Sequence, residues 1–171
     1  MGGALRLSLR EATAEIRRLV HGLRPPMLDA FGLVGAVRQL YDGDAVNEAH
    51  GVDAARRRIA FDVQAPETMP ALPAALEVAA YRIAGEAIQN VLRHSGASRC
   101  TVRFDIAGDA LRLEVRDDGM GFPADRPVGV GTASMHERAA ELRGTLTLQN
   151  AEGGGARVVA VLPMILEPIA L

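Results

Sequence analysis

The chain of 171 residues contains no tryptophan, a single cysteine and few aromatic residues, which make up 4% of the sequence. A hydrophobic core must therefore be filled by Leu, Val, Ile and Ala. The lone Cys100 excludes an internal disulfide and fits a reducing compartment, so we expect a cytoplasmic location. No apolar run approaches the length that spans a bilayer, and no signal peptide is predicted because the N-terminus lacks an apolar segment.

An excess of charge of one sign is also absent. The 19 basic and 21 acidic side chains give a formal net charge of −2. This balance does not favour a nucleic-acid-binding surface or direct membrane contact. The length is typical of one domain with a small appendage, and an apolar content of 49% permits a sizeable core.

The N-terminal stretch carries a heptad pattern over residues 5–23. Its apolar residues are spaced by four and three in turn: Leu5, Leu9, Ala12, Ile16, Leu19 and Leu23. The spacing predicts a coiled-coil-like helix, and it favours a partner helix over packing on its own domain because the apolar stripe is narrow. Pro25 and Pro26 end this helix, and a second helix is predicted from about Asp29.

The remaining residues predict an α+β fold. Alternating apolar residues indicate strands, whereas longer periodic stretches indicate helices. The predicted elements are a strand over 59–63, a helix over 73–94, a hairpin of 100–106 with 111–115, a loop over 118–131, a helix over 132–143, and strands over 145–150 and 156–162. We expect a two-layer sandwich, residues 53–171, whose mostly antiparallel sheet carries helices on one face, preceded by a separate unit of residues 1–52.

The predicted long helix carries a first group of candidate site residues. Glu86 and Asn90 are four residues apart and share one helix face. Asn90 offers a carbonyl oxygen that suits a hard divalent cation. Arg93 and His94 follow one turn later and can supply positive or donor groups to phosphates. The alternative interpretation is a solvated helix edge.

Two glycine-containing motifs follow. Asp117 ends an apolar strand and precedes Gly119 and Gly121, so its carboxylate can accept a hydrogen bond from an adenine amine while the glycines let the backbone approach the ring. Gly129 and Gly131 precede a predicted helix, whose N-terminus favours phosphate. Taken alone, the first motif could be a tight turn and the second a flexible loop.

Together, the order and spacing of these motifs resemble the GHKL (Bergerat) ATP-binding fold shared by gyrase, the Hsp90 chaperones, histidine kinases and MutL. In detail they resemble the nitrate-sensor and DesK-like class of sensor histidine kinases. Residues 81–97 are similar to its N box, residues 115–122 to its G1 box, and residues 129–163 to its G2 region and last hairpin. Residues 16–40 look like the second dimerisation helix and its junction.

The resemblance implies ATP and Mg²⁺ as cofactors. It implies that Asn90 coordinates Mg²⁺, that Glu86 polarises a water or helps to set the metal shell, and that Arg93 and His94 lie near the phosphates and ribose.

For the rest of the nucleotide, the resemblance implies that Asp117 reads adenine, with Gly119 and Gly121 shaping that pocket. Gly129 and Gly131 would flank the triphosphate beneath a short lid over about residues 122–130.

Two positions depart from this family. Ser134 stands where the family usually has glycine, and Ala156 stands where it has a threonine whose hydroxyl often joins the adenine-binding water network. The missing hydroxyl is expected to weaken nucleotide binding by the ~1 kcal/mol of one hydrogen bond.

The resemblance implies that the chain is the ATP-binding catalytic module of a two-component sensor histidine kinase. Such a module transfers the γ-phosphoryl group of ATP to a histidine, from which it passes to a response regulator. The full-length protein is expected to be a homodimer. We expect the acceptor histidine to lie outside the 171 residues. His21 precedes Gly22, His50 lies in a polar linker, and His136 falls in the family's Arg-Glu-Arg context.

Three alternatives remain open. An anti-sigma-type serine kinase of the same fold would lack the heptad helix. A nucleotide-gated interaction module would need long additional domains. A pseudokinase is disfavoured by Asn90 and Asp117.

Overall fold

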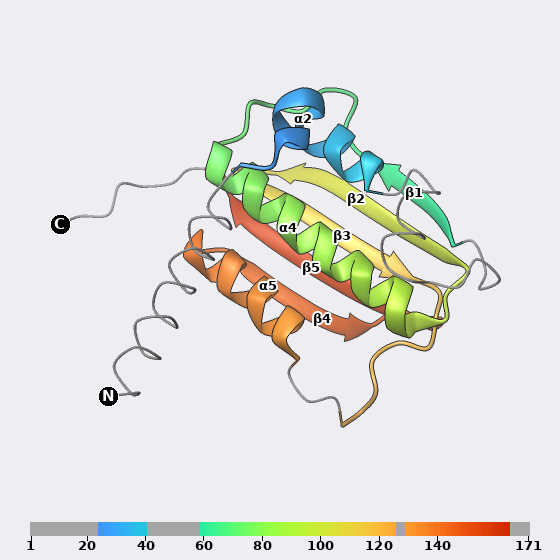
Figure 1. Cartoon of the computed structure of the whole chain (residues 1–171). Helices are drawn as coiled ribbons and strands as arrows, with labels where there is room; N and C mark the ends of the chain where they lie inside the picture. Colours follow the sequence, from blue (N-terminus) through green and yellow to red (C-terminus); the bar gives the residue numbers. More distant parts are fainter. Residues whose placement is uncertain (1–23, 41–58, 126–128, 165–171) are drawn as a thin grey trace, which may run out of the picture.

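The computed structural model describes residues 24–40, 59–125 and 129–164 (Figure 1). The predicted heptad helix over residues 5–23 and the predicted division between residues 52 and 53 lie outside these ranges. The described elements, in chain order, are α2 (Pro26–Gln39), β1 (Ala60–Gln64), α4 (Ala74–Asn90), the π-helical turn η1 (Val91–Ser95), β2 (Arg99–Ala107), β3 (Ala110–Asp117), α5 (Val130–Glu141), β4 (Thr145–Asn150) and β5 (Ala156–Pro163).

The strands form a five-stranded sheet in the order β1-β2-β3-β5-β4. β1 pairs with β2 in parallel, and the other neighbours are antiparallel. The helices α2, α4 and α5 all cover the same face of this sheet (Figure 1). The predicted α+β fold, with a mostly antiparallel sheet and helices on one face, is therefore confirmed.

Alternation along the central strands explains why only one face of the sheet is covered. On β3, Leu111, Leu113 and Val115 are buried beneath the helices, whereas Arg112 and Glu114 lie on the opposite face. Because side chains alternate between the two faces of a strand, this pattern commits one face to the core and leaves the other to ion pairs.

Helix α4 crosses the middle of the sheet and supplies much of the core (Figure 1). Its fully buried residues recur at helical spacing, including Leu76, Ile83 and Ala87. Pro73 is the N-cap residue, directly before the first helical residue, and its fixed φ suits that position. The helix predicted over 73–94 is thus present as α4, which continues into the π-helical turn η1 up to Ser95.

Helix α2 begins earlier than predicted. The expected start near Asp29 is wrong by three residues, because Pro26 occupies the first helical position, where a missing N–H leaves no hydrogen bond unmade. Gly32 interrupts the helix with a φ of 64° and a ψ of 179°. Leu33 and Val37, beyond this kink, are buried in the common core.

Arg24 joins the start of α2 to the start of α4. Its guanidinium lies 2.5 Å from the carboxylate of Asp29 and 2.5 Å from that of Glu77. These pairs raise the pKa of Arg24 above its usual value, with the hydrogen bond to Asp29 as the main cause. None of the helices in the described ranges combines the length and hydropathy of a membrane span.

Candidate nucleotide-binding site

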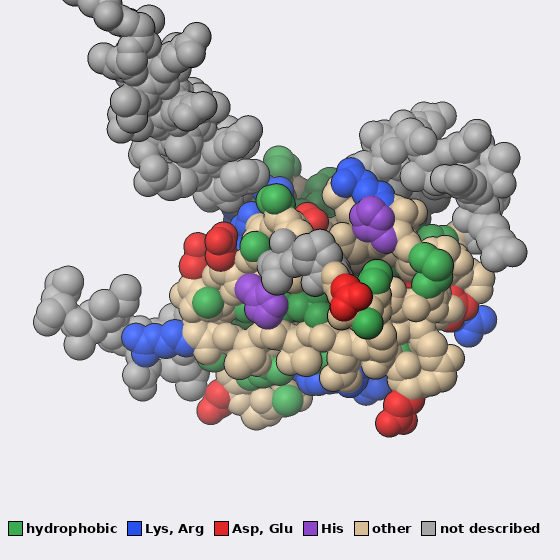
Figure 2. Space-filling model, turned by 90° about the horizontal axis from the view of Figure 1, so that it is seen from below, with side chains coloured by type: hydrophobic (Ala, Val, Ile, Leu, Met, Phe, Trp, Pro, Cys, Tyr) green, Lys and Arg blue, Asp and Glu red, His purple; other side chains and the backbone are tan. Residues whose placement is uncertain are grey.

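A cleft of about 600 Å³ lies where α4, η1, the ends of β3 and β5, and the first turn of α5 meet. This volume suits a small organic ligand. Figure 2 views the molecule from below, where the 118–125 loop lies, and shows hydrophobic side chains on that face. Eight of the nine predicted site residues line the cleft: Glu86, Asn90, Arg93, His94, Asp117, Gly121, Gly129 and Gly131.

Asp117 occupies the end of β3 and is only 4% exposed. One of its carboxylate oxygens accepts a hydrogen bond from the Gly119 amide at 2.8 Å. Val115 and Val158 line the same cleft. A buried carboxylate beside apolar strand residues can accept a hydrogen bond from a flat heterocycle whose faces pack against those side chains.

Gly119, the ninth predicted residue, does not line the cleft, but its amide donates the hydrogen bond to Asp117. A Cβ at Gly119 would overlap the backbone carbonyl oxygen of Ser95, so only glycine fits. The next residue, Met120, donates its amide to the same Ser95 oxygen at 2.9 Å. The loop after β3 is therefore packed directly on the end of η1.

Asp118 fastens this loop to the start of β2. Its carboxylate accepts hydrogen bonds from the Ser98 amide at 2.8 Å, the Ser98 hydroxyl at 2.6 Å and the Arg99 amide at 2.9 Å. These bonds, the Ser98 hydroxyl first, lower the pKa of Asp118 to about 2. Asp118 does not line the cleft, and its bonds to Ser98 and Arg99 fix the chain next to Asp117.

Cys100 lies opposite Asp117 on β2 and is fully buried. Burial, followed by the charges of Asp117 and Asp118, raises the pKa of its thiol to about 12. The thiol therefore stays protonated near neutral pH and does not act as a nucleophile.

Glu86 and Asn90 are half-buried on the face of α4 that borders the cleft. A Cβ at Gly131 would overlap the Glu86 carboxylate, so a glycine there lets the start of α5 approach α4 closely. The predicted start of this helix at residue 132 is wrong by two residues. Gly129 is the N-cap residue of α5, and Gly131 lies within its first turn.

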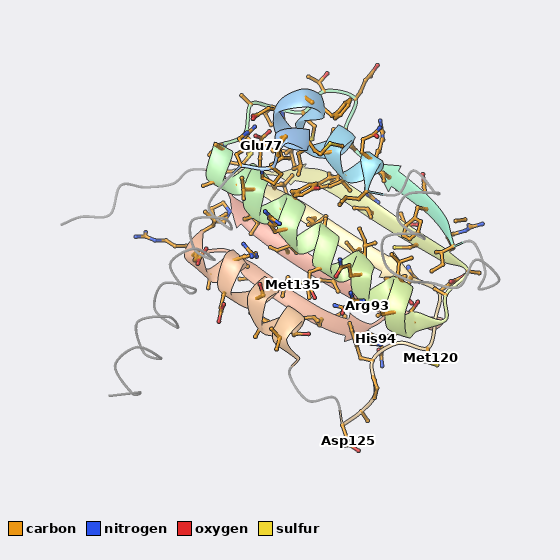
Figure 3. All side chains as sticks on the ribbon, viewed as in Figure 1. Glu77, Arg93, His94, Met120, Asp125 and Met135 are labelled. Carbon is orange, nitrogen blue, oxygen red and sulfur yellow. The ribbon has the colours of Figure 1, made fainter. Side chains whose placement is uncertain are left out.

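Arg93 and His94 are exposed on η1, and Figure 3 shows both at the same end of α4 as Met120. The turn is closed by Ser95, whose hydroxyl donates to the Val91 carbonyl at 2.7 Å and accepts from the Ala97 amide at 3.0 Å. The rim of the cleft on this side thus carries two side chains that can donate to an anion.

The donor set in the cleft fits a cation that arrives with a phosphate ligand. In the ranges that the structure describes, no group of three or more His, Cys, Asp or Glu side chains could hold a metal ion. Mg²⁺ usually keeps several waters and takes one or two protein oxygens besides those of phosphates. Asn90 and Glu86 supply oxygens of that kind at the cleft wall.

Several lining residues were not singled out as site residues by the sequence. They are mostly apolar or small: Val91, Ser95, Val115, Met120, Phe122, Pro123, Val130, Thr132 and Val158. Met120 and Val130 are 79% and 89% exposed, which is unusual for large apolar side chains. Strand alternation would have placed Val115 and Val158 on the covered face, but nothing local indicates that the covered face opens into a cleft.

The match to a family model covers residues 75–166, and the family is described as histidine kinase-, DNA gyrase B-, and HSP90-like ATPase. The chain belongs to this family. The predicted family membership is therefore confirmed, and ATP is the nucleotide that such a domain uses.

Curated relatives narrow the class to sensor histidine kinases. The sensor histidine kinase MctS of Rhizobium johnstonii is 35% identical over 161 residues, which cover 91% of this chain and 33% of that protein. The sensor histidine kinase LiaS of Bacillus subtilis is 33% identical over 159 residues, which cover 92% of this chain and 41% of that protein. The chain thus spans well under half the length of these relatives and corresponds to a histidine kinase catalytic domain.

A solved structure confirms the fold. The histidine kinase domain of the Erythrobacter litoralis EL346 blue-light activated histidine kinase superposes with a TM-score of 0.62 at 20% identity, covering 81% of this chain and 69% of that one. At 20% identity, this similarity supports the fold alone.

Proposed function

We propose that the cleft binds ATP as its Mg²⁺ complex and presents the γ-phosphoryl group to a histidine on a separate segment, from which it passes to a response regulator. The observation that carries this proposal is a buried carboxylate, Asp117, in one cleft with the oxygens of Glu86 and Asn90 and the donors of Arg93 and His94. An adenine site and a phosphate site then lie at opposite parts of one cavity.

Each side chain has a defined task in this proposal. Asp117 accepts a hydrogen bond from the exocyclic amine of adenine, while its other oxygen stays on the Gly119 amide. Asn90 contributes a carbonyl oxygen to Mg²⁺, which neutralises phosphate charge when bound. Arg93 and His94 donate to phosphate or ribose oxygens from the rim of the cleft.

Glu86 is placed to orient a water or a metal ligand, because its carboxylate lies between α4 and the first turn of α5. Phosphoryl transfer requires little covalent chemistry from the protein, so positioning and charge neutralisation supply most of the catalysis. A docked imidazole would then attack in line with the departing ADP. The homodimeric state and the response regulator belong to the full-length protein in this proposal, and they follow from the resemblance to sensor histidine kinases.

Nucleotide titration by calorimetry tests the proposal. We expect Mg²⁺-dependent binding of ATP and weak binding of GTP, whose 6-oxo group cannot donate to Asp117. Asp117→Asn should weaken ATP roughly ten- to a hundredfold, from the ~1–3 kcal/mol of a lost charged acceptor. Asp109→Asn, an exposed carboxylate in the β2–β3 turn, is the matched control. Equal affinity of the unmodified chain for ATP and GTP would refute the assignment.

A further inference from the structure

The side chain of Asn150, the last residue of β4, is bonded to the backbone of the loop that follows β3. Its Oδ1 accepts a hydrogen bond from the Phe122 amide at 2.6 Å, and its Nδ2 donates to the Phe122 carbonyl oxygen at 3.1 Å. The side-chain amide therefore pairs with both backbone groups of one residue, as a neighbouring strand would. These two hydrogen bonds fix both the position and the direction of the chain at Phe122.

The same contact region holds two glycines. Gly121 has a φ of 76°, and a Cβ there would lie 2.6 Å from the Asn150 Oδ1 and 3.1 Å from the Gly155 carbonyl oxygen. Gly155, in turn, packs so closely on the Asp117 backbone that a Cβ would overlap it. Asn150 thus lies in a tightly packed junction of the β3 loop with the β4–β5 turn.

This junction forms part of the cleft wall. Gly121, Phe122 and Pro123 all line the cleft, whereas Asn150 does not. The other end of the same connection is anchored by α5, where Gly129 accepts the first helical hydrogen bond from Ala133 at 3.0 Å. The Asn150 side chain thus attaches this part of the cleft wall to β4.

We infer that Asn150 is a positioning residue for nucleotide binding, and this inference rests on the proposed ATP site. Asn150 acts through Phe122: it holds residues 121–123 as a preformed wall of the cleft. Without this attachment, residues 121–123 must become ordered when the ligand binds. The conformational entropy that they lose makes the free energy of binding less favourable. Removing the amide should therefore weaken the nucleotide without unfolding the domain, because Asn150 is exposed and no apolar core group is lost.

Two variants of the full chain test this inference. Asn150→Ala removes both hydrogen bonds, and Gln149→Ala, on the preceding exposed residue of β4, is the matched control. The measurements are calorimetric titration with Mg²⁺-ATP, hydrogen exchange of the Phe122 amide, and the thermal midpoint. We expect Asn150→Ala to weaken ATP roughly five- to tenfold, to abolish protection of the Phe122 amide, and to leave the thermal midpoint close to that of Gln149→Ala.

Two outcomes would overturn the inference. Rapid exchange of the Phe122 amide in Asn150→Ala with unchanged ATP affinity would show that nucleotide binding does not depend on this attachment. An affinity loss that Gln149→Ala reproduces, or that follows a large fall in the thermal midpoint, would show a general effect on β4. If the unmodified chain failed to bind ATP, the proposed function itself would fail, and the loss of Phe122 protection would still report separately on the attachment.

Discussion

At the scale of single residues, the proposed role of Asn90 in binding Mg²⁺ can be tested separately from binding of the base. Asn90 is the last residue of α4, one turn before Arg93 of η1, whereas Asp117 is the last residue of β3. An amide oxygen can serve Mg²⁺ without the desolvation cost of a second carboxylate. Asn90 should therefore affect the phosphate end of the ligand and leave the adenine end unchanged.

We predict that Asn90→Ala retains the affinity of the chain for adenosine and loses the enhancement of ATP binding by Mg²⁺. Titration of ATP with Mg²⁺ and with EDTA, compared with titration of adenosine, measures both quantities. Gln89→Ala, the preceding residue outside the cleft lining, is the control. An unchanged Mg²⁺ response in Asn90→Ala would contradict the metal role.

Ala156 allows a second test at this scale, of whether a hydroxyl beside Asp117 strengthens nucleotide binding. Extending the register Arg116↔Arg157 by one residue places Ala156 opposite Asp117, and Ala156 lines the cleft. Directly opposed side chains on antiparallel strands lie ~5 Å apart. A hydroxyl at position 156 would therefore be within reach of the Asp117 carboxylate or of a water between it and adenine.

We predict that Ala156→Thr tightens ATP binding about fivefold, the value of about 1 kcal/mol for one net hydrogen bond. Ala156→Val has nearly the same shape without the hydroxyl, and it should bring no such gain. Calorimetric affinities of the two variants decide the matter. Equal effects of threonine and valine would attribute any change to packing.

At the scale of elements, the loop after β3 is held by hydrogen bonds from three other segments, through the backbone carbonyl of Ser95 in η1 and the side chains of Ser98 before β2 and Asn150 in β4. The hydrogen bonds between Asp118 and Ser98 join the end of β3, where Asp117 lies, to the start of β2. Because Asp118 accepts these bonds as a carboxylate, the strength of this attachment depends on pH.

We predict that Asp118→Asn destabilises the domain at neutral pH and that the difference from the unmodified chain disappears in acid. The folded pKa of Asp118, about 2, is below the usual value of 3.8. The stabilisation is therefore complete above about pH 4 and is lost as the pH falls through about 2. Urea unfolding at a series of pH values measures this difference.

Asp125→Asn is the control, because Asp125 is an exposed carboxylate at the tip of the described loop (Figure 3). Its replacement should change the free energy of unfolding little at any pH. A destabilisation by Asp118→Asn that persisted unchanged to pH 2 would show that the charge of Asp118 is not responsible.

At the scale of the whole molecule, the cleft opens to solvent and the proposed acceptor must reach it from elsewhere. Met120 and Val130, two highly exposed apolar residues, flank this opening. In the described ranges, His94 and His136 are the histidines, and His136 does not line the cleft. In the proposed function, the acceptor is therefore a histidine that another segment presents to the cleft.

We predict that the chain alone, incubated with γ-labelled ATP, does not label its own histidines and hydrolyses ATP only slowly, because water is positioned less well than a docked imidazole. A purified helix that carries a histidine followed by Asp or Glu should restore transfer if the two assemble. Stoichiometric acid-labile, base-stable label on His21, His50 or His136 would contradict this prediction.

The sequence by itself was sufficient for the strands, the central helix and eight of the residues that line the cleft. Alternation along β3 and the spacing of Glu86 and Asn90 are local properties, expressed over a few residues of chain. Helix starts were less well predicted, since α2 and α5 begin at Pro26 and Val130, before their apolar patterns become visible.

Only the tertiary structure decided which distant segments meet. Arg24 pairs with Glu77, 53 positions away, and Asn150 holds Phe122, 28 positions away. Gly131 is necessary because the Glu86 carboxylate lies against it, and no pattern within either helix reveals that contact. Periodicity predicts which face of an element is buried, but the close approach of two faces depends on how all the elements pack together.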